Sequence, residues 1–349
     1  MNMKSILLGT AAGLMVASAA QAADLPGEPT PAAVDYVKVC DAFGTGFFYI
    51  PGTETCLKFD GRVRVQAGTG IQYASSDNVV RLNTDARFGV DVRSATELGT
   101  LRTYVRIATT PSSGALFDRA FIQLGYLTVG KAANFYDSFG GLAGSAIADR
   151  NWGGDDYTQI TLLADNLGGG FYAGIQAHAT APVLLRQEFD FDDKKGAADF
   201  PDVEAIIGIA DQPWGSAALA AWYSNQPGDD FFSVKGGVSF KATDALTVNA
   251  TAIYLDNVGI GGFNADSIQI GLGAEYAVSD AVSVYGLGQY SFNDLDGGPN
   301  ADSWGVTLGA TYTIVSGLVA TAEVAYDDGE NNIVADNDFS GVLRLTREW

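Results

Sequence analysis

The sequence is poor in the residues that most enzymes and nucleic-acid-binding proteins use for their chemistry. Its 349 residues include one histidine and two cysteines, which leaves little for a metal site or a catalytic triad. The 20 Lys and Arg residues are outnumbered by 41 Asp and Glu residues, and the formal net charge is −21. No basic face is therefore expected to bind nucleic acid. The composition predicts no enzyme, no metal site and no cofactor.

Charged residues and long apolar runs are scarce as well. Charged residues make up 17% of the chain and hydrophobic residues 47%, so the charged surface typical of a soluble protein is thin. After the N-terminus no apolar run reaches about 20 residues, the length that a membrane-spanning helix needs. The sequence is therefore not that of a helical membrane protein.

The N-terminus has the features of an export signal. Lys4 precedes an apolar stretch at residues 6–20, and Ala20, Gln21 and Ala22 supply a small-x-small cleavage motif. We expect residues 1–22 to be a signal peptide that is removed. Residues 23–56 then form a leader, rich in Ala, Pro and acidic residues at its start, and an N-terminal segment closed by a disulfide.

That disulfide is predicted from the compartment. An exported protein enters an oxidising environment, and Cys40 and Cys56 are the only two cysteines. Closing this short loop would stabilise the fold by roughly 3 kcal/mol in the chain-entropy account. The alternative is a pair of buried free thiols.

From Leu57 onward apolar residues recur at every second position, which is the period of a β-strand with two different faces. Ile268, Ile270 and Leu272 share one face of such a segment, and Gln269 and Gly271 share the other. Sixteen strands are predicted in this way, at residues 57–68, 79–93, 98–110, 116–125, 126–131, 157–166, 169–180, 202–211, 214–225, 231–241, 245–257, 265–277, 281–292, 302–313, 317–327 and 338–349.

The connections between these strands indicate how the strands are arranged. Long polar connections (residues 69–78, 131–156, 181–201, 293–301 and 328–337) mostly alternate with tight turns such as residues 242–244 and 279–280. Outer-membrane barrels have short turns at one rim and longer loops at the other, with an apolar face toward lipid and a polar face toward water inside. A soluble sandwich has no reason to alternate so regularly.

The spacing of tyrosines supports a barrel in a membrane. Tyr254, Tyr290 and Tyr326 are separated by 36 residues, as are Tyr276 and Tyr312. Each set falls at the ends of strands that run in one direction. We expect the two sets to form girdles at opposite interfaces, where an aromatic ring with a polar tip is stable.

Three stretches resemble the general porins of alpha-proteobacteria. Residues 36–62 read YVKVCDAFGTGFFYIPGTETCLKFDGR, and residues 118–131 read DRAFIQLGYLTVGK, followed by Phe135, Tyr136 and Phe139. The last eleven residues, FSGVLRLTREW, are also similar, although they end in Trp349 where that family usually has Phe. Between about residues 200 and 335 only the strand pattern is similar.

The resemblance implies a fold, an assembly and a function. The chain is expected to be an all-β protein, a transmembrane antiparallel β-barrel of sixteen strands at residues 57–349, with a third loop at residues 131–156 folded inward. It would form homotrimers in the bacterial outer membrane, in contact with outer-membrane lipid and lipopolysaccharide. Small hydrophilic solutes and ions would diffuse passively through each water-filled barrel.

Strand alternation then predicts which charges line the pore. An arginine facing lipid near the midplane costs about 2 to 4 kcal/mol, so arginines in strands are expected to point inward. The predicted basic wall comprises Arg62, Arg64, Arg81, Arg87, Arg93, Arg102 and Arg106, with Lys131. The third loop is rich in glycine and carries the predicted acidic residues of the constriction, Asp137, Asp149, Asp155 and Asp156. Opposed charges across a narrow pore would orient dipolar solutes.

Four other interpretations remain open from the sequence. The barrel could be plugged and act as an adhesin or structural anchor, or the chain could be a secreted soluble β-sandwich or lectin. An outer-membrane lipase would need His178, for which no nucleophile motif is present. The acidic stretches at residues 293–298 and 327–330 offer oxygen ligands for Ca²⁺ but lack the twelve-residue ligand spacing.

Overall fold

The computed structural model of the chain describes residues 38–69, 80–110, 114–144, 146–147, 156–178, 201–226, 229–260, 263–298, 300–329 and 338–349. The predicted signal peptide, most of the predicted leader, Asp149 and Asp155 lie outside these residues. The description below concerns the compact unit that begins at Val39.

The described residues form one antiparallel sheet of 17 strands. The strands are β1 (Phe48–Tyr49), β2 (Cys56–Thr69), β3 (Arg81–Thr96), β4 (Gly99–Thr110), β5 (Gly114–Leu124), β6 (Leu127–Ala133), β7 (Asp156–Ala164), β8 (Phe171–His178), β9 (Asp202–Gln212), β10 (Gly215–Gln226), β11 (Asp229–Lys241), β12 (Leu246–Ile260), β13 (Phe263–Ala277), β14 (Val282–Leu295), β15 (Ser303–Val315), β16 (Leu318–Gly329) and β17 (Asp338–Glu348). Two short 3₁₀ helices, η2 (Asp41–Phe43) and η4 (Phe135–Ser138), lie outside the sheet.

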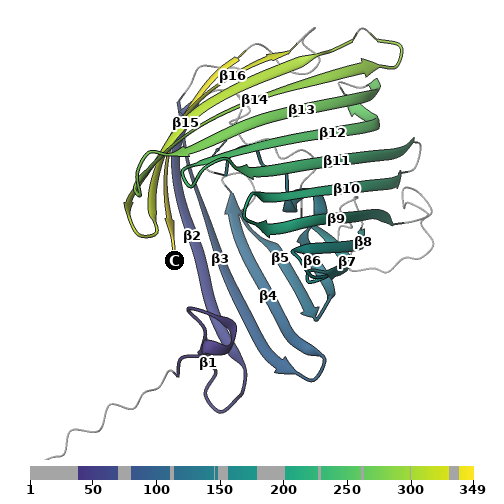
Figure 1. Cartoon of the computed structure of the whole chain (residues 1–349). Coiled ribbons are helices and arrows are strands. Elements are labelled where there is room, and N and C mark those ends of the chain that lie inside the picture. The colour runs from purple at the N-terminus through teal and green to yellow at the C-terminus, as the bar shows by residue number, and fades with distance from the viewer. Residues whose placement is uncertain are drawn as a thin grey trace, which may run out of the picture. The chain divides into compact units, whose positions relative to one another are not determined.

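The sheet closes into a barrel of the sixteen strands from β2 to β17. Each of these strands pairs with the next along the chain, and the last strand pairs antiparallel with β2, for example Leu345 opposite Val65. Figure 1 shows this seam, where the yellow end of the chain meets the purple β2. The sixteen predicted strands and the antiparallel barrel are confirmed, with strand ends that differ from the prediction by a few residues.

Side chains alternate between two faces of this closed sheet. The outer face carries exposed apolar residues, such as Leu272 and Leu343 at 60% and 65% exposure. The side chains between them are mostly polar or glycine and face the interior. A barrel in a membrane meets hydrocarbon outside and water inside, and this pattern of apolar outer and polar inner side chains is typical of such barrels.

The tyrosines lie at the two rims on the outer face. Tyr254 and Tyr326 lie near the ends of β12 and β16, and Tyr326 contacts the rings of Trp304 and Phe339 at 5.4 and 5.6 Å between centroids. Tyr276 and Tyr312 lie near the ends of β13 and β15, which point to the opposite rim. The two predicted sets of tyrosines therefore lie toward opposite ends of the strands, and their role as girdles stays a prediction.

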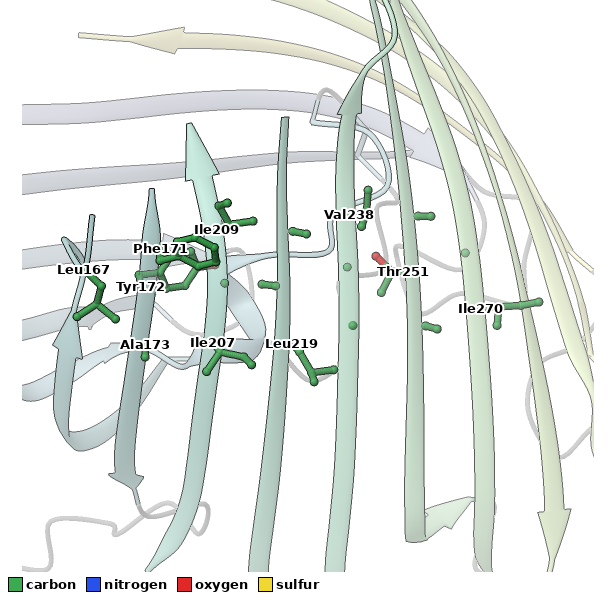
Figure 2. Close-up of a pocket in the computed structure, with 18 residues that line it drawn as sticks. Leu167, Phe171, Tyr172, Ala173, Ile207, Ile209, Leu219, Val238, Thr251 and Ile270 are labelled. Atoms are coloured by element: carbon green, nitrogen blue, oxygen red, sulfur yellow. The ribbon is translucent and has the colours of Figure 1, made fainter. Parts of the chain in front are cut away.

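The outer face of β8 to β13 is hollowed into a shallow apolar groove. Figure 2 shows Phe171, Ile207, Leu219, Val238 and Ile270 along it, from neighbouring strands. Alanine and glycine at the positions between them, such as Ala217 and Gly236, leave the space open. The groove belongs to the apolar outer surface and is separate from the polar interior.

A small disulfide-closed module precedes the barrel. Cys40 and Cys56 form the predicted disulfide, with Cα atoms 6.1 Å apart, and are buried with Phe47. The two-residue β1 pairs with the start of β2. At the other end of the chain, backbone hydrogen bonds of 3.2 Å join Trp349 to Gly61 of β2, so the last residue completes the seam.

No helix among the described residues is long and apolar enough to cross a membrane.

Candidate functional site

The interior of the barrel carries a wall of arginines on β2, β3, β4 and β5. Alternation along these strands turns Arg62, Arg64, Arg87, Arg93, Arg102, Arg106 and Arg119 to the inside, opposite in parity to exposed residues such as Val63 and Phe88. We call these seven residues the arginine wall. Arg81 has the same parity but lies at the exposed end of β3.

Most of the arginine wall is neutralised by carboxylates on the same strands. Asp91 of β3 is nearly buried and forms ion pairs with both Arg93 and Arg102, each at 2.8 Å. Arg62 pairs with Asp85 at 3.1 Å. Most of the predicted basic residues are thus bound into a network rather than held free in the lumen.

A β-bulge extends this network to the third loop. The pairing of β4 with β5 shifts between Arg106 and Ile107, which leaves Asp118 as the extra residue of β5. Asp118 and Arg119, consecutive in the sequence, then both reach the interior. Asp118 pairs with Arg106 at 2.5 Å and lies 3.6 Å from Arg87.

The loop acids that the structure describes contact the arginine wall directly. Asp156, at the start of β7, pairs with Arg119 at 2.9 Å and with Arg106 at 3.4 Å. Asp137 pairs with Arg119 at 3.4 Å. The sequence predicted that these carboxylates would face the arginines across the pore. In the structure Asp137 and Asp156 instead contact the arginines directly. Asp149 and Asp155 lie outside the described residues.

Lys131 lies on the opposite side of the barrel wall from the position that was predicted. It pairs in register with Ala120 of β5 and shares its parity on β6 with the exposed Leu127 and Val129. Its Nζ lies 3.5 Å from the carbonyl oxygen of Phe117. Because Lys131 has the parity of the outer face, we leave it out of the arginine wall.

The loop after β6 is held against the wall formed by β9 to β16. We call its described part, residues 134–144 and 146–147, the loop segment. Inward-facing side chains bind its backbone, so that these buried polar groups are satisfied although the segment has little regular structure. The hydrogen bonds are Phe135 N to Glu204 at 3.0 Å, Lys235 Nζ to Tyr136 O at 2.7 Å, Thr251 Oγ1 to Gly140 O at 2.7 Å, Asn249 Nδ2 to Leu142 O at 3.0 Å and Ile147 N to Glu323 at 2.7 Å.

Glycines on the inner face of this wall let the loop segment approach closely. A Cβ at Gly237 would lie 2.9 Å from the ring of Phe139, and one at Gly271 would lie 2.6 Å from the side chain of Leu142. A Cβ at Gly273 would overlap the carbonyl oxygen of Leu142. These glycines are the ones that alternation places on the polar face, and their role is to provide room.

Glu204 fixes the start of the loop segment. Its carboxylate accepts hydrogen bonds from Asn134 Nδ2 at 2.9 Å and from the Phe135 amide, and it lies 2.8 Å from His178 Nε2. The side chains of His178 and Glu204 are both fully buried. The single histidine therefore packs under the loop with Tyr157, whose ring stacks on it at 4.5 Å between centroids.

An apolar cluster inside the barrel covers this anchor. Phe135 and Tyr136 of η4 pack on Ile206, Trp222 and Ile253. Burial raises the pKa of Tyr136, whose hydroxyl stays protonated and donates to Ser233 Oγ at 3.0 Å. The loop segment thus has a small core of its own on one side of the lumen.

Glu323 fixes the other end of the loop segment. Its carboxylate accepts the Ile147 amide and the hydroxyl of Tyr285, each at 2.7 Å. The segment therefore crosses the inner face of the barrel from β9 to β16. Among the described residues no group of three or more His, Cys, Asp or Glu side chains is arranged to hold a metal ion.

Several important residues were missing from the predicted site. Asp91, Asp118 and Arg119 were not among the predicted residues of the pore, and the bulge in β5 brings the last two inward together. Glu204 and Glu323 are inward-facing acidic residues, and each shares its face with a second buried acid, Asp202 on β9 and Asp327 on β16. The pattern of acidic residues along these strands therefore does not distinguish the two glutamates from their neighbours.

Comparison with known proteins agrees with this architecture. A family model described as "Porin subfamily" matches residues 24–342. Porin Omp2b of Brucella suis biovar 1 is 34% identical over 278 residues, which cover 73% of this chain and 74% of the relative.

Solved structures of low sequence identity share the fold. The outer membrane channel DcaP of Acinetobacter baumannii has a TM-score of 0.69 at 14% identity, covering 86% of this chain and 99% of that one. The trimer form of OmpT of Vibrio cholerae has a TM-score of 0.62 at 15% identity, covering 85% of this chain and 100% of that one. The family match and the closed barrel identify a channel protein, not an enzyme, that crosses the bacterial outer membrane many times. The chain belongs to the porin family.

Proposed function

We propose that small hydrophilic solutes and ions diffuse passively between the arginine wall and the loop segment. The observation that carries this proposal is the placement of the two features on opposite parts of the inner face. The arginine wall lies on β2 to β5, and the loop segment is bound to side chains of β9 to β16. The loop segment narrows the lumen without contacting the arginines along most of its length.

The paired charges suit a passage for polar solutes. Guanidinium and carboxylate groups at 2.5 to 3.6 Å are already hydrogen-bonded to one another, so a solute need not strip water from an isolated charge to pass them. The wall still presents many donors and acceptors, which favours hydrated polar solutes over apolar ones. We place the constriction at Asp137 and Asp156 with Arg106 and Arg119, where loop and wall meet.

We also propose that the protein assembles as a homotrimer. The trimeric form of the similar OmpT structure supports this assembly, and the exposed apolar outer face supplies the surface for it and for outer-membrane lipid and lipopolysaccharide. Electrophoresis without heating, followed by mass determination of the detergent-purified protein, tests the trimer.

Liposome swelling tests the diffusion function. Liposomes that contain the purified protein are diluted into isotonic solutions of a pentose, a disaccharide or a tetrasaccharide. A channel gives swelling that slows as the sugar grows, because the loop segment limits the width. Swelling no faster than that of protein-free liposomes with every sugar would instead show a plugged barrel, as an adhesin or anchor would be.

A further inference from the structure

Arg64 differs from the rest of the arginine wall in its surroundings. Within the described residues, every other member of the wall lies within 3.6 Å of a carboxylate oxygen. Arg64 has no such partner in this part of the chain. Its Nε is buried and makes no hydrogen bond to the described residues. One positive charge of the wall is therefore left without a counter-charge.

The neighbours of Arg64 increase this excess of positive charge. The register of β17, β2 and β3 places Arg64 between Thr346 and Asp85, with Arg62 two residues away on the same face. The charged groups that act on Arg64 are Arg344, Arg62 and Arg87 against a single carboxylate, Asp85. That carboxylate already accepts from Arg62.

Arg344 adds a second guanidinium at the seam of the barrel. It projects inward from β17, and its Nε donates to the neutral side-chain oxygen of Gln66 at 2.8 Å. This hydrogen bond fixes the position of the Arg344 guanidinium beside Arg64. Two guanidinium groups on neighbouring strands thus face the same part of the lumen, where an anion would complete the alternation of charge seen along the rest of the wall.

We propose that Arg64 binds anionic solutes in this pore, with Arg344 and Arg87 beside it, and that its ligands are small oxyanions. A guanidinium fork matches the oxygens of carboxylates and phosphates and forms two parallel hydrogen bonds to them. This proposal rests on the proposed channel function and refines it. Solute recognition belongs to one unpaired arginine at the β17–β2 seam, and the paired arginines shape the lumen around it.

Block of single-channel current by inorganic phosphate, with acetate as a second probe, tests the site in planar bilayers. Arg64→Gln removes the binding fork. The loss of a charge-assisted hydrogen bond of about 1.5 to 3 kcal/mol raises the half-blocking phosphate concentration by about tenfold or more. Arg64→Lys keeps the charge but loses the bidentate geometry, and should restore part of the block. Equal loss with acetate and phosphate assigns the site to oxyanions in general, and loss with phosphate alone assigns it to phosphates.

Two variants serve as comparisons. Arg347→Gln removes an arginine that lies on β17 with the opposite parity to Arg344 and contacts the backbone of Ser316, and should leave the block unchanged. Arg102→Gln removes an arginine that is paired with Asp91 and should have a smaller effect than Arg64→Gln.

Three results would overturn the proposal. They are an unchanged block in Arg64→Gln, an effect of Arg102→Gln as large as that of Arg64→Gln, and the absence of any block in the wild-type channel. Failure of the channel function itself is distinguishable, because the wild-type protein would then carry no current. If Arg64→Gln does not assemble, Arg64→Lys still decides, since a block equal to wild type would contradict a bidentate site.

Discussion

At the scale of single residues, the net charge of the arginine wall depends on how many carboxylates its arginines share. Asp91 accepts hydrogen bonds from both Arg93 and Arg102, and Asp156 serves both Arg106 and Arg119. Asp91 leaves its cluster with a net positive charge, whereas Arg87, Arg106 and Arg119 are balanced by Asp118, Asp137 and Asp156. The arginine wall is therefore basic overall, although nearly every arginine is paired. Removal of one carboxylate makes the net charge of the wall more positive and leaves all of its guanidinium donors in place.

Asp91→Asn should shift the ion preference of the channel toward anions. The substitution leaves Arg93 and Arg102 in the lumen without the carboxylate that now lies 2.8 Å from each, and the added net positive charge attracts anions. The measurement is the reversal potential in a KCl gradient. Asp165→Asn, in the connection between β7 and β8 and away from this cluster, is the control. An unchanged reversal potential, or a shift toward cations, would contradict the assignment of this cluster to the pore.

At the scale of elements, a loop is fixed in place by two carboxylates on distant strands. Glu204 on β9 holds the first residues of the loop segment, and Glu323 on β16 holds its last described residue. Between them Lys235, Asn249 and Thr251 donate to backbone carbonyl oxygens. An irregular segment inside a barrel needs such partners, because its backbone groups have lost water. The width of the lumen thus depends on side chains far from the arginines.

Glu204→Gln should loosen the loop segment and make the open current noisier. A carboxylate accepts from all three neighbouring donors, whereas an amide turns one NH₂ group toward them, and each lost hydrogen bond to a buried charge is worth about 1.5 to 3 kcal/mol. We expect more frequent brief changes of single-channel current and faster swelling with the disaccharide. Glu97→Gln, in the exposed turn between β3 and β4, is the matched control. A current as quiet as that of the wild type, in a variant that folds and inserts, would exclude Glu204 as an anchor.

At the scale of the whole molecule, alternation predicted the closed barrel because one rule acts on every strand. The position of Arg62, Arg87 and Arg106 followed from the parity of their apolar neighbours, since the membrane penalises the opposite orientation. Parity failed locally at the bulge beside Arg106, which brings Asp118 and Arg119 inward together. Lys131 was assigned inward without regard to the parity of β6.

The loop contacts could not be predicted in the same way. Glu204 and Glu323 meet the loop segment across a large separation in sequence, and nothing local to either strand specifies which backbone amide it receives. Likewise, the inward glycines that accommodate Leu142 read as ordinary small residues of a polar face until the loop is placed on them. The strand period thus predicted the barrel, whereas the position of the loop segment inside it depends on tertiary contacts that the local sequence does not specify.

The orientation of the barrel predicts opposite consequences for two substitutions on one strand. Leu272 of β13 lies on the outer face with Ile268 and the girdle residue Tyr276, whereas Gln269 lies on the inner face. Leu272→Arg should lower the free energy of unfolding in phospholipid vesicles by about 2 to 4 kcal/mol and leave the conductance unchanged, because it places a charge in hydrocarbon. Gln269→Arg should alter the ion preference with little loss of stability, because water in the lumen solvates the new charge. Urea titration in vesicles and reversal potentials, measured on both variants, separate the two effects. If the two variants exchanged these outcomes, the apolar face would be the one that lines the pore.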